Sequence, residues 1–315
     1  MKFSLVITTY NRLELLKRAI ACGFNQTVPC EVVVADDAST DGTEEYVRSL
    51  GDRVVYHRNT QNLNHAATVN HGVAVASGDW VKFLDDDDYL APDCIEKMTA
   101  AIAQHPKAVL CSCQAIQVNE HGTELRRTPA TGPGQVFYIP QQAIHYGMLM
   151  DQVPFGTPAQ VAARRDAFLQ IGGWDTTMTT NYDDIDAWVK LADFGDALFI
   201  NECLAYRTLW AGGYEQKMAL SQRRALNFAI KERIYRRVSE SYRDRIPSLA
   251  AIDHYLHLHW GLVALRQRQI TTGLSLLAAG ARSPQAWQLL GQARKLRWSS
   301  TELHGPTVPR TVLVP

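Results

Sequence analysis

Apolar residues in the first half of the chain fall into short continuous runs that alternate with stretches of three- to four-residue spacing. The runs predict strands buried on both faces, at residues 3–8, 31–35, 53–57 and 79–84. The spaced stretches predict helices, beginning near residue 12 and over 43–50 and 66–76. Strands that alternate with helices favour an α/β fold, with a doubly wound and mostly parallel sheet. Ligands bind such sheets beyond the carboxyl ends of the strands.

The pattern changes further along the chain. A strand is expected over 107–118, followed by a Pro- and Gly-rich stretch and a segment to about Thr157 that could include a mobile loop. Amphipathic helices rich in Arg, Leu and Ala follow, at 221–239, 250–268, 271–282 and 284–297. We therefore expect an α/β domain over 1–215, a helical appendage over 216–299 and an extended tail over 300–315.

The composition excludes several classes of protein. The 315 residues contain 32 Lys and Arg against 32 Asp and Glu, so there is no basic excess of the kind that indicates a nucleic-acid partner. No stretch reaches the ~18 to 20 apolar residues that span a bilayer. The chain begins directly with a strand-like run and no signal peptide, so we expect a cytoplasmic protein, at most peripheral to the membrane. The cysteines lack zinc-site spacing and are expected to be reduced.

Four consecutive aspartates, Asp85 to Asp88, follow directly on the apolar run 80–84. Adjacent like charges repel unless a cation neutralises them, so the run is a candidate seat for Mg²⁺ or Mn²⁺. The alternative is a solvated acidic turn before a helix that Pro92 opens.

Three further polar clusters follow predicted elements. Residues 8–12 end the first strand and could hold a planar base, although Asn11 could instead cap the next helix. Residues 36–42 end the second strand and carry carboxylates that could accept from a base or a ribose, although Ser39 or Asp41 could be a helix cap. Residues 183, 184 and 186 are acidic and precede a helix expected over 187–194, where capping residues are common.

Four strings, taken together and in order, resemble the family 2 glycosyltransferases: VITTYNR, VVVADDASTDGT, ASGDWVKFLDDDDYLAPD and GGWDTTMTTNYDDIDAWVKLADFG. The resemblance covers about residues 3–213. It implies a GT-A fold, a nucleotide-diphosphate sugar donor that most often carries uridine, and a divalent metal, Mn²⁺ or Mg²⁺. It also implies transfer of the sugar, with inversion, to a hydroxyl of a saccharide, glycolipid or glycoprotein.

The resemblance also implies roles for individual residues on the donor side. Thr8, Tyr10 and Asp37 would lie against the nucleoside, with Asp36 nearby. Asp85 and Asp87 match the two aspartates of the family's DxD signature. Asp87 would ligate the metal, and Asp85 would lie near the ribose or the metal and its waters. Asp86 would support donor binding, and Asp88 would support the run.

On the acceptor side, the resemblance makes Asp184 the general base that takes the proton of the acceptor hydroxyl, with Asp183 as its companion in place of the more usual glutamate. Trp174 and Asp175 would form the turn that shapes the acceptor pocket, and Asp186 would contribute to acceptor binding.

The chain departs from the family pattern in two places. Many members carry Tyr-Arg-x-His after the last core strand, whereas this chain has Leu209 at the histidine position, followed by Trp210. The family's Ala-Arg-Asn is here Thr-Val-Asn, so that Asn70 is kept and the arginine is absent. Both departures concern diphosphate binding. His254, His257 and His259 fan around one predicted helix and are poor joint metal ligands.

Two other functions are considered. A sugar-1-phosphate nucleotidyltransferase would carry a Gly-rich phosphate-binding run near the N-terminus, and residues 6–12 lack glycine. A catalytically silent nucleotide-sugar-binding scaffold would lack the metal or base carboxylates, and both sets are present.

The helix expected over 221–239 carries an apolar stripe, formed by Leu226, Ile230, Ile234 and Val238, with basic residues on its other faces. One hypothesis packs the stripe against the α/β domain or a second subunit, which would make a homo-oligomer, and leaves the basic residues solvated. The other places the stripe or its basic flanks on an anionic bilayer. The stripe is narrow and lacks a Trp anchor, which favours packing.

Overall fold

The computed structural model describes residues 1–178, 182–210 and 218–301, with side chains described up to residue 293. The strands are β1 (Phe3–Thr9), β2 (Glu31–Asp36), β3 (Val54–Arg58), β4 (Trp80–Asp85), β5 (Tyr89–Leu90), β6 (Ala108–Val118), β7 (Glu124–Arg127), β8 (Val136–Ile139), β9 (Val161–Arg164) and β10 (Asp196–Thr208). The helices are α1 (Leu13–Phe24), α2 (Thr43–Ser49), α3 (His65–Val75), α4 (Cys94–Gln104), α5 (Gln141–Leu149), α6 (Arg165–Gln170), α7 (Asp183–Leu191), α9 (Leu220–Arg237), α10 (Leu249–Arg266), α11 (Ile270–Gly280) and α12 (Pro284–Thr301).

The strands form one mixed sheet in the order β3-β2-β1-β4-β9-β6-β10-β5, with β7 beside β6 and β8 beside β10. The neighbours β3, β2, β1 and β4 are all parallel, as expected from the alternation of strands and helices. β9 lies antiparallel between β4 and β6, which joins this parallel half to the β6–β10 pair. The expected α/β fold with a doubly wound, mostly parallel sheet of GT-A type is confirmed.

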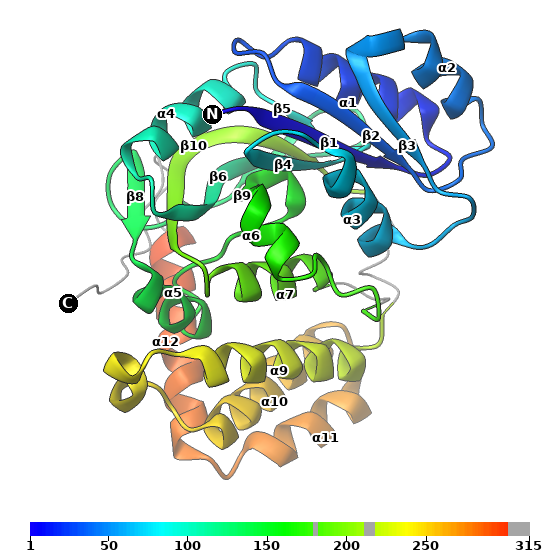
Figure 1. Ribbon diagram of the computed structural model, residues 1–315. Coiled ribbons are helices and arrows are strands. Elements are labelled where there is room, and N and C mark those ends of the chain that lie inside the picture. The colour runs from blue at the N-terminus through cyan, green and yellow to red at the C-terminus, as the bar shows by residue number, and fades with distance from the viewer. Residues whose placement is uncertain (179–181, 211–217, 302–315) are drawn as a thin grey trace.

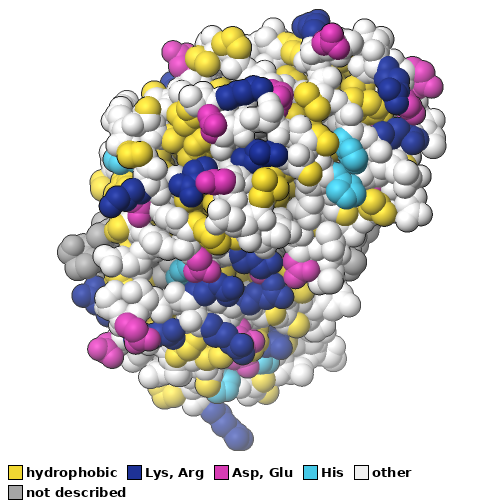
Figure 2. Space-filling model, in the orientation of Figure 1, with side chains coloured by type: hydrophobic (Ala, Val, Ile, Leu, Met, Phe, Trp, Pro, Cys, Tyr) yellow, Lys and Arg dark blue, Asp and Glu magenta, His cyan; other side chains and the backbone are white. Residues whose placement is uncertain are grey.

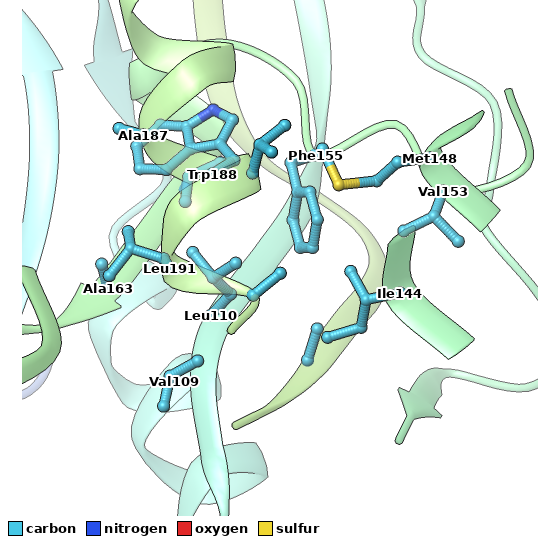
Figure 3. Packing of buried hydrophobic residues seen from close by; sticks show 14 of the residues in the cluster. Val109, Leu110, Ile144, Met148, Val153, Phe155, Ala163, Ala187, Trp188 and Leu191 are labelled. Carbon is cyan, nitrogen blue, oxygen red and sulfur yellow. The ribbon is translucent and has the colours of Figure 1, made fainter. Parts of the chain in front are cut away.

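Alternating residues of the central strands pack in two separate cores. Leu5 and Val32 face the layer of α1, α2 and α4. Val6 and Phe83 face the layer of α3, α5, α6 and α7, where Trp188 of α7 lies beside Phe155 and above Leu110 of β6 (Figure 3). The buried area on both faces explains why the strands read as continuous apolar runs.

Two expected segments differ from the structure. The segment up to Thr157, for which we predicted no regular elements and which could include a mobile loop, contains β7, β8 and the buried helix α5. The helix expected to begin at residue 187 begins at Asp183. An earlier start places three carboxylates in the first turn, where the helix dipole favours negative charge. The boundary expected near residue 215 and the tail beyond residue 301 lie outside the described residues.

The C-terminal helices lie below the sheet in Figure 1, with α9 closest to α7 and α11 outermost. Ile230, Ile234 and Val238 of the α9 stripe belong to the same core as β1 and β4, as do Ile252 and Leu256 of α10. Packing of the stripe against the α/β layer is therefore confirmed. In the described part of the chain, no helix is both long and apolar enough to cross a membrane.

The basic residues of α9 are not all solvated, contrary to our expectation. Lys231 is buried, and its Nζ atom donates to the carbonyl oxygens of Met148 at 3.1 Å and Leu149 at 2.6 Å. Arg237 donates to Asp193 at 3.0 Å. On the face in Figure 2, basic and acidic side chains lie side by side near the middle of the view. These contacts fix α9 to the α/β layer.

Candidate active site

Two cavities meet below the carboxyl ends of the central strands. One, of about 500 Å³, is lined by the ends of β1, β2 and β4, and we call it the strand-end cavity. The other, of about 620 Å³, lies between α7, α9 and residues 153–158, and we call it the helix cavity. His65 and Asp85 line both. The two cavities can therefore hold the two parts of one reaction.

The register of the sheet brings the expected donor-side residues together. Thr8 is paired with Ala35 of β2 and with Asp85 of β4, so the three strands end at one edge. The Thr8 hydroxyl donates to Asp85 at 3.1 Å. Tyr10 lines the strand-end cavity with an exposed ring that can offer its face to a planar base.

Asp37 also lines the strand-end cavity, and its carboxylate is fixed by the loop before α3. It accepts from the side chain of Asn59 at 2.8 Å and from the backbone amides of Leu63 at 2.8 Å and Asn64 at 3.2 Å. A carboxylate has about four lone-pair positions, so one remains for a ligand donor.

Asp36, which we expected near the nucleoside, lies next to Asp37 but does not itself line either cavity. Its carboxylate is fully buried, and it accepts from the Ser39 amide at 2.8 Å and the Tyr56 hydroxyl at 2.7 Å. Asp36 therefore holds the β2 turn together. Asn11, which could have capped α1, accepts from the Thr40 amide at 2.7 Å and joins two loops instead, whereas Asp41 accepts from the Thr43 amide at the start of α2 at 3.3 Å.

The aspartate run gathers three carboxylates. Asp85, Asp87 and Asp88 offer oxygens that all lie within 4.8 Å of one another. We expected Asp85 and Asp87 at the metal, and the structure adds Asp88, which is buried and accepts from the Thr208 amide at 2.8 Å. Asp86 points elsewhere and accepts from the Thr9 hydroxyl at 2.8 Å.

The charges of this cluster fit a divalent cation. Burial and the neighbouring carboxylates raise the pKa of Asp87 and hold that of Asp88 well above its usual range. Burial opposes ionisation of Asp85 as well, but the charge of His65 outweighs it and lowers that pKa. Oxygen ligands that repel one another are stabilised by a hard cation such as Mg²⁺ or Mn²⁺. The donor set therefore suits either ion.

Polar groups on both sides hold Asp87 in place. Its Oδ2 atom accepts from Nη1 of Arg12 at 2.9 Å and from Nε1 of Trp210 at 2.9 Å. Trp210 follows Leu209, which occupies the position of the family histidine. The indole of Trp210 thus contacts the Asp87 carboxylate from the position that follows Leu209.

The first turn of α7 supplies two carboxylates to the helix cavity, Asp183 and Asp184. Oδ1 of Asp184 accepts from the Ile185 amide at 2.7 Å. Burial, together with the charge of Asp183, raises the pKa of Asp184 to about 7. A carboxylate with a pKa near neutrality is suited to act as a general base.

His65, which the sequence analysis missed, lies between the two groups of carboxylates. Its Nε2 atom is 2.8 Å from Oδ1 of Asp85, and its Nδ1 atom is 3.8 Å from Oδ2 of Asp183. Burial by itself would lower the pKa of His65, but the two carboxylates raise it well above its usual value. The signal in the sequence was its place after the third strand, at the same sheet edge as the other clusters.

Trp174 lines the helix cavity as expected, and Asn70 fixes its backbone. The Asn70 side chain accepts from the Trp174 amide at 2.8 Å and donates to its carbonyl at 2.9 Å. Gly173 has φ +75°, and a Cβ there would lie 2.3 Å from Oδ1 of Asn70. The turn therefore requires glycine, and the Asn70 of the family motif positions Trp174.

Asp175 and Asp186, which we expected on the acceptor side, do not line the helix cavity. Asp175 accepts from the Thr177 amide at 3.0 Å and shapes the turn. Asp186 is 1% exposed, lies 2.6 Å from Nζ of Lys190 and accepts from Arg233 of α9. Both carboxylates therefore secure the contact between the α7 region and α9.

The C-terminal helices also line the helix cavity. Arg223, Asn227 and Lys231 of α9 and Trp260 of α10 lie opposite the aromatic side chains Tyr182 and Trp188. The segment 148–158 forms another wall. The segment before Thr157 and the helical appendage therefore both contribute to this cavity.

Comparison with known proteins gives a consistent picture. The model of the family described as Glycosyl transferase family 2 matches residues 4–172. Protein CgeD of Bacillus subtilis is 27% identical over 228 residues, which are 66% of this chain and 50% of that protein. The chain thus spans about half the length of this relative. A Campylobacter jejuni protein, GalNAc(5)-diNAcBac-PP-undecaprenol beta-1,3-glucosyltransferase, is 41% identical over 95 residues, or 28% of this chain and 30% of that protein.

Two solved structures share the fold. S. aureus TarS 1-349 in complex with UDP-GlcNAc superposes with a TM-score of 0.61 at 14% identity, covering 94% of this chain and 92% of that one. Mannosyltransferase PcManGT from Pyrobaculum calidifontis, in complex with GDP-Man and Mn²⁺, gives a TM-score of 0.56 at 21% identity, covering 94% of this chain and 80% of that one.

Proposed function

The chain belongs to glycosyl transferase family 2, and we propose that it transfers a sugar, with inversion, from a nucleoside diphosphate sugar to a hydroxyl of a saccharide, glycolipid or glycoprotein. One observation carries the proposal. The strand-end cavity, with its carboxylate cluster, and the helix cavity, with the carboxylates of α7, meet at His65 and Asp85. A donor in the first and an acceptor in the second would bring their reacting atoms to this junction.

The nucleoside would lie in the strand-end cavity. The Tyr10 ring offers a face for the base, and the free lone pair of Asp37 can accept from a base N–H or a ribose hydroxyl. The two fold neighbours named above are complexes with UDP-GlcNAc and GDP-Man. UDP is our first choice of nucleotide because uridine is the commonest donor base in the family.

The diphosphate would lie beside the aspartate run. Asp85, Asp87 and Asp88 would hold Mn²⁺ or Mg²⁺, and the bound cation would neutralise the negative charge that develops on the diphosphate as it leaves. Arg12 lies at this edge, and Arg207 is close enough to favour the charged forms of Asp85 and Asp88. Both arginines add positive charge on the side of the leaving group.

The transfer itself needs a base on the other side of the anomeric carbon. Asp184 takes the proton of the acceptor hydroxyl while the oxygen forms a bond to that carbon. The bond between the carbon and the β-phosphate oxygen breaks, and its electron pair leaves with the nucleoside diphosphate. Attack from the face opposite the leaving group inverts the anomeric carbon. The negative charge of Asp183 helps to raise the pKa of Asp184, and His65 lies between Asp183 and Asp85.

The acceptor would enter the helix cavity. The aromatic side chains that line this cavity, such as Trp174 and Tyr182, combine an apolar face with a polar edge, which suits a sugar ring. The name of the C. jejuni relative specifies an undecaprenol-linked saccharide, so a lipid-linked saccharide is the first acceptor class to test.

A donor screen tests the proposal. The full chain is incubated with individual nucleotide sugars, with and without Mn²⁺, and released nucleoside diphosphate and pyrophosphate are measured separately. We expect slow release of UDP that requires the cation and Asp184. Pyrophosphate release would instead indicate nucleotidyl transfer, and donor binding without any turnover would indicate a binding scaffold.

A further inference from the structure

The outer face of α11 carries exposed apolar side chains. Ile270 is 55% exposed and Leu274 is 59% exposed, and their four-residue spacing places them on one side of the helix. Trp287 at the start of α12 is 47% exposed, and its Nε1 atom donates to the Ala281 carbonyl at 2.9 Å. The Trp ring therefore lies against the α11–α12 turn. We call Ile270, Leu274 and Trp287, with the arginines described next, the α11 face.

Basic residues flank this apolar stripe, and the sequence around them contains no acidic residue. From residue 254 to residue 293 the sequence contains no Asp or Glu, although the whole chain has 32 of each sign. Arg266 and Arg268 are exposed at the turn before α11, and Arg282 is exposed at the turn after it. The charge of this surface is therefore positive at both ends of the stripe.

Close packing against α10 fixes the orientation of α11. A Cβ at Gly273 would lie 2.6 Å from Cδ2 of Leu265, and one at Gly280 would lie 2.5 Å from the His254 carbonyl oxygen. These glycines bring the two helices into direct contact, and Gly261 of α10 packs in the same way against Leu277. The apolar stripe cannot turn inward, because the inner side of α11 is already filled.

We propose that the α11 face docks on the surface of an anionic lipid bilayer. An apolar stripe with Trp and flanking arginines is the composition of a helix that lies in the membrane interface. A second copy of the chain fits less well, because a symmetric contact would bring the arginines of the two copies together with no acidic partner in this region. Exposed Ile and Leu side chains favour lipid over nucleic acid, whose binding surfaces are more polar.

The α11 face lies close to the helix cavity, so docking of this face would place the cavity near the bilayer surface. Trp260 of α10 lines the cavity, and Gly261, the next residue, packs against α11. The membrane face and the cavity thus lie on two sides of one helix. This role of docking rests on the proposed transfer to a lipid-linked saccharide, which would be presented at the bilayer surface.

Cosedimentation of the full chain with vesicles tests the docking directly. We would compare phosphatidylcholine vesicles with vesicles of equal parts phosphatidylcholine and phosphatidylglycerol, at low and at physiological salt. We expect binding to the anionic vesicles that weakens with salt, because exposed charges are screened. The variant Arg266→Gln/Arg268→Gln/Arg282→Gln should bind about tenfold more weakly or worse, since each basic contact near the surface is worth about a factor of five.

The apolar part is tested by Ile270→Gln/Leu274→Gln, with Leu125→Gln/Leu169→Gln as a matched control, because Leu125 and Leu169 are exposed elsewhere on the chain. Ile270→Gln/Leu274→Gln should lose binding to the anionic vesicles, and the control variant should keep it. Thermal unfolding checks that each variant folds, and UDP release from the donor in solution should be unchanged in all of them. If the parent chain releases no UDP from any donor, the proposed function is contradicted. The docking proposal is judged separately, by vesicle binding alone.

Three results would overturn the docking proposal. One is a lack of binding to anionic vesicles at low salt by the folded parent chain. Another is equal binding by the parent and both α11 variants. The third is a dimer in sedimentation equilibrium that Ile270→Gln/Leu274→Gln dissociates, which would assign the face to a second copy of the chain.

Discussion

His65 and Asp85 form the contact at which the two cavities join, with Nε2 of the imidazole 2.8 Å from Oδ1 of the carboxylate. Asp85 belongs to the proposed metal site, whereas the other imidazole nitrogen lies 3.8 Å from Asp183, the neighbour of the proposed base Asp184. The Trp174 ring packs edge-on against the imidazole, with centroids 5.3 Å apart. A single side chain therefore contacts the aspartate run, the first turn of α7 and the turn at Trp174.

Replacing His65 with Asn should affect turnover more than donor binding. The change removes the positive charge between Asp85 and Asp183, so both carboxylates lose a partner and their mutual repulsion increases. We expect turnover to fall about tenfold or more, with UDP affinity changed only a few-fold. Initial rates and calorimetric titration of UDP measure the two effects. His121→Asn is the control, because His121 is highly exposed and lies away from both cavities; equal losses in both variants would contradict a specific role.

Asp87→Ala should abolish cation-dependent donor binding. It removes one of three carboxylates that can ligate the ion and leaves the diphosphate charge less well compensated. Titration of UDP with and without Mn²⁺ should show that the affinity gained from Mn²⁺ disappears, and removal of the cation by a chelator should have the same effect on the parent. Asp52→Ala, at an exposed site, should behave as the parent. Unchanged Mn²⁺-dependent affinity in Asp87→Ala would exclude Asp87 as a ligand.

Trp210→Phe tests whether the indole compensates for the missing histidine. The change keeps one aromatic ring and removes the five-membered ring of the indole, with the N–H that donates to Asp87 at 2.9 Å. A hydrogen bond that orients a metal-ligating carboxylate typically changes metal affinity by about 10- to 100-fold, so Mn²⁺ affinity should fall by about tenfold or more. Electron paramagnetic resonance of free Mn²⁺ measures the affinity directly. Trp287→Phe is the matched control, and a result equal to that control would show that Trp210 does not support the ion.

The sequence predicted the parallel half of the sheet well because buried strands leave continuous apolar runs. It also placed Thr8, Asp37 and the aspartate run at one edge, since strand ends converge there. Asp36 and Asp37 are both buried, but only Asp37 lines the strand-end cavity, and the pattern of charges along the strand end does not show this difference. His65 and Lys231 were missed for another reason. The place of His65 after the third strand is a signal in the sequence, but its contacts, like those of Lys231, come from distant segments that no local pattern identifies.

Asp184→Asn should abolish the pH dependence of turnover while leaving donor binding nearly unchanged. The pKa of Asp184 is raised to about 7 by burial, and a base must be deprotonated, so parental kcat/KM should rise with pH up to about 7 and level off above it. The variant should keep donor affinity within a few-fold and lose turnover by about 100-fold or more, with no such rise left.

The same pKa shift predicts an effect on stability with the opposite sense. Because the folded state holds this proton more tightly than the unfolded state, the stabilisation from Asp184 is present at acidic pH and is lost as pH rises through about 7. Asp184→Asn should therefore unfold at higher urea than the parent above this pH. Lower stability of the variant at such pH would contradict the assignment of a raised pKa.

Lys231→Met should destabilise the contact between α9 and α5. The Lys231 ammonium group donates to the carbonyls of Met148 and Leu149, at the C-terminal end of α5 where helix carbonyls lack partners. Methionine keeps the length of the side chain and leaves these buried carbonyls without that donor, which costs about 1–3 kcal/mol. The partner Asp151 is largely exposed, so loss of its ion pair adds little. Urea unfolding measures the change, and Arg236→Met, an exposed position on the same helix, is the control. Equal stability of the two variants would mean that the apolar stripe alone holds α9 against the sheet.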